Sequence, residues 1–282
     1  MRKRLPGAVL LATTLALGAR LAALPAPAPG QNAAPAAKPK AGPVPRMRDG
    51  KPDMQGFWET EPRLQISAAI EEHGNAFGIR ASPRVIDTPD GKIPYQPWAL
   101  AERDRRRREG NAYEDPEGKC ALGGVPHQMY VLFPVVLFLQ PPGAFVMTFE
   151  YVHAYRHVDM TRTKHYPDNI RLWQGDSIGR WDGDVLVIDT TNLNGKPWLE
   201  LYGDFVGADA HIVERMTMRD SNTIDYTATI DDPKTFTKPW SMAFSFLRGE
   251  YEQLYEENCH ETNVDLEHMK RLYDAAHADD KK

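Results

Sequence analysis

Residues 177–190 of the chain read SIGRWDGDVLVIDT, the clearest strand–turn–strand pattern in the sequence. The pair Asp182-Gly183 separates two runs of apolar and β-branched residues, which is the strongest short signal of a β-hairpin. We expect one strand over residues 170–181 and a second over residues 184–191. The stretch therefore indicates an antiparallel β protein.

Similar strand patterns, joined by tight turns, continue on both sides of this hairpin. They cover residues 55–60, 135–140, 144–159, 210–219, 223–230, 239–248 and 250–259. A meander of this length usually closes on itself, because closure removes the unpaired strand edges. The sequence predicts a mostly β, up-and-down barrel.

The first strand carries a short motif that points to a particular kind of barrel. Gly56-x-Trp58 is similar to the Gly-x-Trp that opens lipocalins, where the Trp plugs the closed end of the barrel. We therefore expect an antiparallel meander that closes into a lipocalin-like (calycin-like) barrel. Residues 61–130 form an irregular segment with a predicted helix over 97–109, and such segments usually pack over the sheet. A short amphipathic helix is expected over 264–276.

The start of the chain has the pattern of an export signal. Three basic residues follow Met1, an apolar run covers residues 5–24, and Ala/Pro-rich sequence extends to about residue 45. Pro6, Gly18 and Arg20 interrupt the apolar run, so a cleaved signal is favoured over a membrane anchor. We expect a signal peptide over 1–30, a disordered tether over 31–46 and a single barrel domain over 47–282. The expected location is periplasmic or secreted, with no stable membrane span after cleavage.

The two cysteines, Cys120 and Cys259, are expected to form one disulfide, because exported proteins rarely keep reactive thiols. On the chain-entropy estimate, a loop of that length stabilises the fold by about 4–5 kcal/mol. The alternative is two free thiols that act as metal ligands or nucleophiles. The disulfide is favoured.

Composition and motifs exclude several classes of function. The net charge is −5, and acidic residues surround the one basic run, Arg105 to Arg108, so we expect no nucleic-acid partner. His153 and His157 are about 13 Å apart on a strand, too far to share a metal ion. The chain has no Gly-rich nucleotide loop and no nucleophile elbow. We therefore expect neither a cofactor nor a metal.

Strand alternation selects the candidate catalytic carboxylates. Glu214 lies on the same strand face as apolar residues, so it either titrates as a general acid or base or belongs to a structural ion pair. A two-residue hairpin loop would place Asp176 opposite Asp189, where the two carboxylates would share a proton or use Arg180. In the alternative, Asp189 caps the strand end and Asp176 faces the solvent. Arg180 is also a candidate to hold an anion.

The predicted strand over 144–159 provides candidates for ligand contact. Phe149, Tyr151, His153 and Tyr155 share one face, and Arg156 lies on the other. The aromatic rings would stack on a flat ligand, and His153 would carry protons. Tyr226, on the apolar face of the 223–230 strand, completes the predicted ligand-binding set. The same residues could instead pack beneath the 61–130 segment.

Longer stretches give a broader resemblance. The chain from about residue 49 to residue 263 resembles a large group of uncharacterised exported bacterial proteins. The shared stretches read DGKPDMQGFW, DGKIPYQPW, DPEGKC, HAYRHV, SIGRWDGDVLVIDT, IDDPKTFTKPW and EENC. The resemblance implies a common fold, and it transfers no activity.

Three functions fit these patterns. The first is binding of a small hydrophobic or aromatic molecule inside the barrel, which the lack of a recognisable catalytic pattern favours. The second is a cofactor-independent acid–base enzyme, such as a lyase, isomerase or hydratase, which the inward ionisable groups favour. The third is an envelope interaction protein whose plugged barrel binds no ligand.

Overall fold

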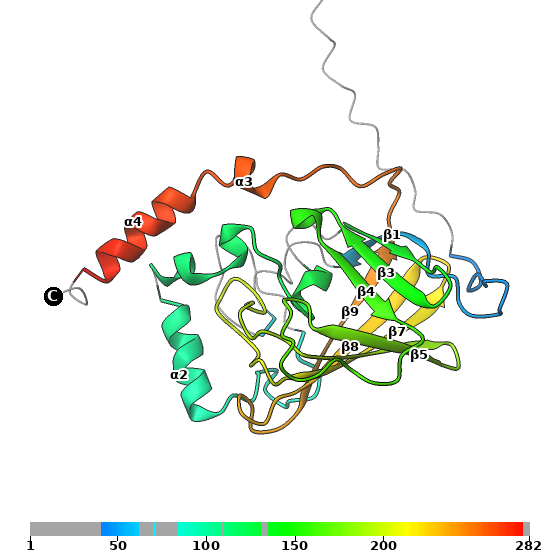
Figure 1. The fold of residues 1–282 in the computed structure, drawn as a ribbon, viewed down its shortest axis with the longest axis horizontal. Coiled ribbons are helices and arrows are strands. Elements are labelled where there is room, and N and C mark those ends of the chain that lie inside the picture. Colours follow the sequence, from blue (N-terminus) through cyan, green and yellow to red (C-terminus); the bar gives the residue numbers. More distant parts are fainter. Residues whose placement is uncertain (1–40, 62–69, 72–83, 109, 131–134, 279–282) are drawn as a thin grey trace, which may run out of the picture. The chain divides into compact units, whose positions relative to one another are not determined.

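A computed structural model describes residues 41–61, 70–71, 84–108, 110–130 and 135–278. Within these residues, nine strands form one closed barrel in chain order, and β1 pairs with β9 to close it (Figure 1). The prediction of a mostly β, lipocalin-like barrel is confirmed. The strands are β1 (Gly56–Glu61), β2 (Val135–Leu139), β3 (Ala144–Phe149), β4 (Tyr155–Asp159), β5 (Asp176–Asp182), β6 (Val185–Thr191), β7 (His211–Asp220), β8 (Thr223–Asp231) and β9 (Trp240–Arg248).

Short helices precede, interrupt and follow these strands. The segment before β2 contains α2 (Pro97–Arg106) and the 3-10 turns η1 (Asn111–Glu114), η2 (Glu117–Lys119) and η3 (His127–Tyr130). A fourth turn, η4 (Tyr151–His153), separates β3 from β4, and α3 (Cys259–Thr262) and α4 (Leu266–Ala276) follow the barrel. No described helix is long and apolar enough to cross a membrane.

The segment before β2 contacts the barrel and the chain around Phe236. Val85 forms a bridge with Met242 of β9, and Tyr95 forms one with Phe236. The predicted disulfide is confirmed: Cys120 is bonded to Cys259, with their Cα atoms 5.7 Å apart. This bond ties the end of η2 to the start of α3. The predicted signal peptide and most of the predicted tether lie outside the described residues.

The strand predicted over 144–159 is wrong, because the chain reverses within it. β3 and β4 are antiparallel neighbours, and Ala144 pairs with Asp159. Val152 and His153 have φ angles of 50° and 51°, which turn the backbone through η4. Apolar and polar residues still alternate through the turn, so the sequence pattern alone does not reveal the break.

Two other strand expectations need correction. Residues 250–258 form no strand, because β9 already pairs with β8 and β1 and the closed barrel has no free edge. β4 and β5 are parallel, so a crossover over residues 160–175 interrupts the predicted antiparallel meander.

Trp58 is buried in the core near the end of the barrel at which β1 begins. Its side chain is 0% exposed, and its indole N–H donates to the Met54 carbonyl at 2.7 Å. The Arg248 guanidinium lies over the ring, 4.2 Å from its centroid. Gly56 has a φ angle of 111°, a backbone conformation that favours glycine. We call this end of the barrel the closed end.

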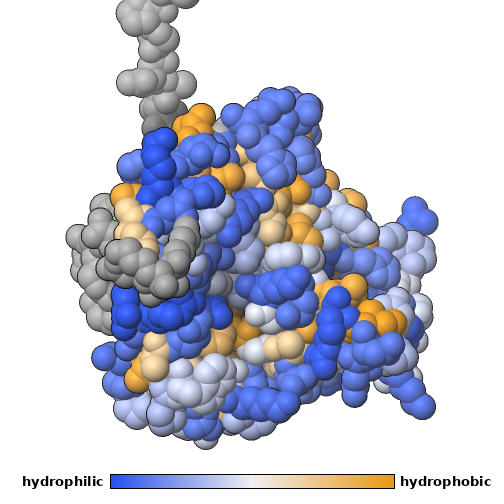
Figure 2. Space-filling model, turned by 60° about the vertical axis from the view of Figure 1, so that its left-hand side comes forward, coloured by the Kyte–Doolittle hydropathy of each residue, from blue (hydrophilic) through white to orange (hydrophobic). Residues whose placement is uncertain are grey.

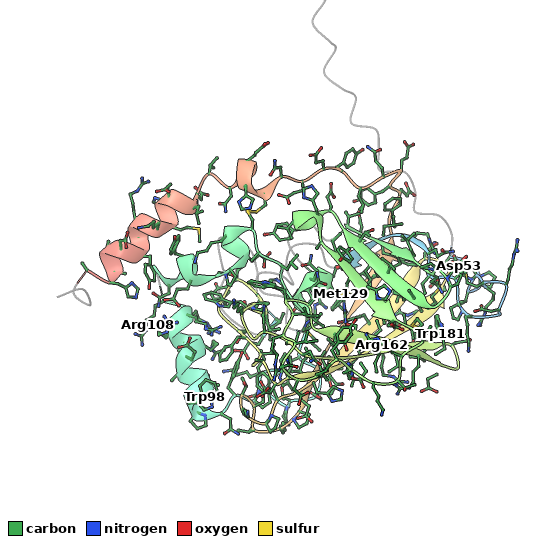
Figure 3. The ribbon with its side chains drawn as sticks, viewed as in Figure 1. Asp53, Trp98, Arg108, Met129, Arg162 and Trp181 are labelled. Carbon is green, nitrogen blue, oxygen red and sulfur yellow. A yellow bond between two sulfur atoms is a disulfide. The ribbon has the colours of Figure 1, made fainter. Side chains whose placement is uncertain are left out.

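The opposite end, which we call the mouth, lies under η3. Thr60, near the end of β1, donates to the Met129 carbonyl at 2.8 Å, and the Tyr130 ring packs edge-on against Phe244 of β9. Figure 3 shows Met129 in the interior of the domain. The hairpin turns after β2, β5 and β7 lie at the closed end instead, because these strands run toward Trp58.

Candidate functional site

A buried hydrogen-bond network occupies the inside of the barrel. Glu214 is 0% exposed, and its Oε1 accepts from Arg156 at 2.9 Å and from the Tyr226 hydroxyl at 2.7 Å. Oε2 of Glu214 accepts a second hydrogen bond from Arg156. Arg156 also donates to Ser177 at 3.0 Å and to Thr190 at 2.9 Å. Three residues selected from the sequence, Glu214, Arg156 and Tyr226, therefore meet in one network.

The charges of this network stabilise one another. Burial lowers the pKa of Arg156, but the Glu214 charge and the hydrogen bonds to Glu214, together with Tyr226, outweigh burial, so the pKa is raised overall. Burial, followed by the Glu214 charge, raises the pKa of Tyr226 well above its ordinary value, so the phenol keeps its proton. Each charged group has its partner within the network, which favours the structural ion pair over the general-acid reading of Glu214.

A second buried cluster lies at the mouth, and sequence reasoning missed it. Oε2 of Glu117 is 3.3 Å from Nδ1 of His127, which lies 2.9 Å from the Trp198 carbonyl oxygen. Both neighbours of Nδ1 are acceptors, so Nδ1 carries the proton and Nε2 is left as an acceptor. Neither that Nε2 nor either oxygen of the Glu117 carboxylate has a hydrogen-bond partner among the described residues.

Burial shifts the ionisation of this cluster toward neutral forms. It raises the pKa of Glu117 to about 7. Burial, together with the Glu117 charge, raises the pKa of Asp115 to about 7, and burial lowers the pKa of His127 to about 4. The only sequence signal for these carboxylates was the shared stretch DPEGKC, which contains both. Strand alternation could not select them, because they lie in turns.

Two further acidic groups, Glu200 and Asp204, are buried near the segment that precedes β2. Both oxygens of Glu200 accept backbone N–H groups, from Tyr202 and Asp204, each at 2.9 Å. Burial and then the Asp204 charge raise the pKa of Glu200 well above its ordinary value. Arg103 of α2 contacts Asp204 at 3.4 Å and also bonds Glu71. Burial therefore raises the pKa of three carboxyl groups at the mouth, those of Asp115, Glu117 and Glu200.

The predicted pairing of Asp176 with Asp189 is wrong. In the observed register Asp176 pairs with Thr191, and Asp189 pairs with Ile178. Asp182 pairs directly with Val185, so the hairpin loop is Gly183-Asp184. The prediction placed the two-residue loop one position earlier in the chain, at Asp182-Gly183. Moving the loop by one position changes the partner of each strand residue by two, so Asp176 pairs with Thr191 in place of Asp189.

His165 nevertheless brings the two carboxylates together. Its Nδ1 lies 3.1 Å from Asp176 and its Nε2 lies 3.0 Å from Asp189. Nε2 of His211 contacts the same Asp189 oxygen at 2.9 Å. Burial raises the pKa of Asp176, but Arg162 and further hydrogen bonds lower it below its ordinary value overall. Both ring nitrogens of His165 therefore lie within hydrogen-bond distance of a carboxylate, and this side chain joins the 160–175 crossover to the barrel wall.

The turn at η4 separates the remaining candidates. Phe149 is buried in the core, and Tyr151 is buried at the mouth, where its hydroxyl donates to the Glu117 carbonyl at 3.3 Å. Tyr155 is 70% exposed, and His153 is also exposed. The predicted aromatic row therefore does not form, because the reversed chain directs its members to different places.

A pocket of about 850 Å³ lies at the closed end, away from the buried acids. It is bounded by the 46–53 segment, the β2–β3 turn and the end of β5. Phe145, Met160 and Trp181 provide apolar surface, and Arg180 is one of three arginines in the lining. Figure 3 shows Asp53 and Trp181, both in the lining, at the same end of the domain.

A second, more open pocket of about 610 Å³ lies between α2 and the chain around Phe205, and Trp98 lines it. Within the described part of the chain, no group of three or more His, Cys, Asp and Glu side chains could hold a metal ion. No protein-family model and no curated protein matches the sequence.

Proposed function

We propose that the barrel domain binds a small hydrophobic or aromatic molecule in the pocket at its closed end. The observation that carries this proposal is the pocket itself. Its volume of about 850 Å³ lies within the range of small-molecule sites, and its lining combines apolar side chains with a few charged groups. Ligand sites in proteins commonly have this composition.

The inside of the barrel is a weaker candidate for the ligand site. Trp58, Phe138, Phe145 and Phe246 fill it, and each of them is at most 1% exposed. The Arg156–Glu214 network occupies the polar part of the interior. A ligand there would have to displace closely packed side chains, which is costly. The pocket at the closed end has space for a ligand without any such displacement.

On the face that Figure 2 shows, the surface has no continuous hydrophobic patch that would suggest another site for an apolar ligand. Hydrophobic side chains there form separate patches between hydrophilic ones. Scattered exposed apolar residues are normal on soluble proteins and need no partner. The pocket is therefore the best-supported place for an apolar ligand.

The proposal is tested with N-phenyl-1-naphthylamine, an uncharged aromatic probe whose fluorescence rises in apolar surroundings. Trp181→Ala removes the large ring from the lining, and we expect the affinity for the probe to fall at least about fivefold, the loss of one aromatic contact. Ala144→Trp, at a half-buried position in the lining, fills the pocket without opening the core and should also weaken binding.

Trp98→Ala is the matched control, because Trp98 lines the other pocket and is 56% exposed. Its affinity for the probe should equal that of the wild type. Binding that is lost in Trp98→Ala and kept in the two closed-end variants would contradict the proposal, as would no binding to the wild-type protein.

The mouth cluster favours a second candidate function, that of an acid–base enzyme. Carboxyl groups that titrate near pH 7 beside a neutral imidazole are suited to proton transfer. Native mass spectrometry after incubation with a metabolite extract tests this candidate. A bound molecule released with altered mass by the wild type, but not by Glu117→Gln, would support an enzyme. Release with unchanged mass would support a binding protein.

We also propose that the protein is exported to the periplasm or secreted. The basic and apolar start of the chain and the Cys120–Cys259 disulfide support this, because disulfides persist in oxidising compartments. Cell fractionation of the full chain tests it. Recovery of the uncleaved, reduced chain from the cytoplasm would contradict export.

A further inference from the structure

Two arginines in the closed-end pocket have no partner among the described residues. Arg48 comes from the segment before β1 and Arg180 from β5, and neither makes a hydrogen bond or ion pair with any described residue. The third arginine of the lining, Arg46, is different, because it bonds both oxygens of Asp184 at 2.5 and 2.7 Å. Two guanidinium groups of the pocket are therefore available to a ligand.

The carboxylates of the pocket are engaged with their own segment. Oδ1 of Asp49 accepts the Lys51 backbone N–H at 3.0 Å, and Oδ1 of Asp53 accepts the Gln55 backbone N–H at 3.1 Å. The lining contains three arginines, Arg46, Arg48 and Arg180, and two aspartates, Asp49 and Asp53. Three minus two leaves an excess of one positive charge in the lining.

The apolar part of the lining is suited to a flat molecule. Trp181 is half-buried against the core, and Lys51 lies 6.0 Å from the centroid of its ring. Phe145 and Met160 come from the barrel wall and from the residue that follows β4, and both contribute to the same pocket. Arg48, Arg180 and Trp181 all belong to the lining of this one pocket.

We infer that the ligand is an amphipathic anion, with a flat apolar body and one carboxylate, sulfonate or phosphate group. The body contacts Trp181 and Met160, and the anionic group takes the hydrogen bonds of Arg48 and Arg180. Guanidinium groups match planar or branched oxyanions better than ammonium groups do, because they present parallel N–H donors. This inference rests on the proposed function, and it specifies the chemical class of the ligand.

The test compares two probes that share one ring system. 1-Anilinonaphthalene-8-sulfonate carries a sulfonate, and N-phenyl-1-naphthylamine is uncharged. In fluorescence titrations of the full chain, we expect the sulfonate to bind the wild type more tightly than the uncharged probe. In the double variant Arg48→Ala/Arg180→Ala, the affinity for the sulfonate should fall about tenfold, the loss of charge-assisted hydrogen bonds, with little change for the uncharged probe.

Arg108→Ala is the matched control, because Arg108 is an exposed arginine that follows α2 and lies outside both pockets (Figure 3). It should leave both affinities unchanged. Equal affinities of the two probes, or equal losses in Arg108→Ala and in the double variant, would overturn the anion inference while the proposed function stands. Binding of neither probe to the wild type would overturn the proposed function itself.

Discussion

The sharpest prediction concerns the buried pair inside the barrel. In Glu214→Gln the side chain keeps its shape but loses its charge. Three donor groups, two from Arg156 and one from Tyr226, converge on the two oxygens of Glu214. An amide has only one oxygen, and its NH2 group would face donors. The variant therefore leaves the Arg156 charge buried without a counter-ion.

Removing one member of a buried ion pair costs about 3–5 kcal/mol, because the remaining charge stays uncompensated. Glu214 is 0% exposed and Arg156 is 2% exposed, so no solvent is available to screen that charge. In a domain of this size, about 1 kcal/mol corresponds to about 2–4 °C in Tm. We therefore expect Tm to fall by roughly 6–20 °C.

Urea denaturation followed by tryptophan fluorescence measures the change in the free energy of unfolding. The slope with denaturant should stay unchanged if the native fold is retained. Arg156→Met/Glu214→Leu, which removes both charges, should regain most of the lost stability. Glu256→Gln, at an exposed position, is the control. A loss below about 1 kcal/mol in Glu214→Gln would refute the reasoning, because a surface pair is worth that little.

Three further predictions concern other parts of the domain. Replacing both Cys120 and Cys259 with serine opens a loop that spans 139 residues, and the free energy of unfolding should fall by about 5 kcal/mol in urea denaturation. From about pH 6.5 to about pH 8, Tm should fall as pH rises, because burial raises the pKa of Glu117 to about 7 and the native state therefore holds a proton that the unfolded chain has released. Glu117→Gln should weaken that pH dependence. His165→Ala should speed hydrogen exchange at the amide of Tyr166 roughly fivefold. This amide donates to the Asp176 carboxylate, and the variant removes the partly exposed contact between His165 and the same carboxylate.

Each of these predictions has an outcome that contradicts it. Equal stability of the double serine variant and the oxidised wild type would contradict the first. A Tm that rises from about pH 6.5 to about pH 8 would contradict the second. Burial lowers the pKa of His127 to about 4, so its effect on the pH dependence of stability is opposite to that of the carboxyl groups, but this effect is confined to pH values below about 6.5, the ordinary pKa of histidine. For the third, His157→Ala is the control, an exposed histidine on β4. Equal exchange rates in the two histidine variants would show that His165 does not hold the crossover.

Local sequence patterns were enough to predict most of the barrel. Asp-Gly turns and two-residue alternation depend on backbone preferences of neighbouring residues, so they can be read without knowing the fold. They located the hairpin of β5 and β6, the β7–β8 pair and the first strand, which carries the buried Trp58. They also placed Glu214 and Tyr226 on the inner face. The cysteine count was sufficient for the disulfide.

Only the tertiary structure decided which side chains meet. The reversal at Val152 and His153 leaves the alternating pattern unbroken, so it could not be seen in the sequence. The partners of Glu117 and His127 depend on how the turns of the segment before β2 pack over the mouth. The pocket at the closed end depends on three segments that lie far apart in the chain. Periodicity determines the face on which a residue lies, whereas contacts between faces and turns depend on register, closure and long-range packing, which no local pattern contains.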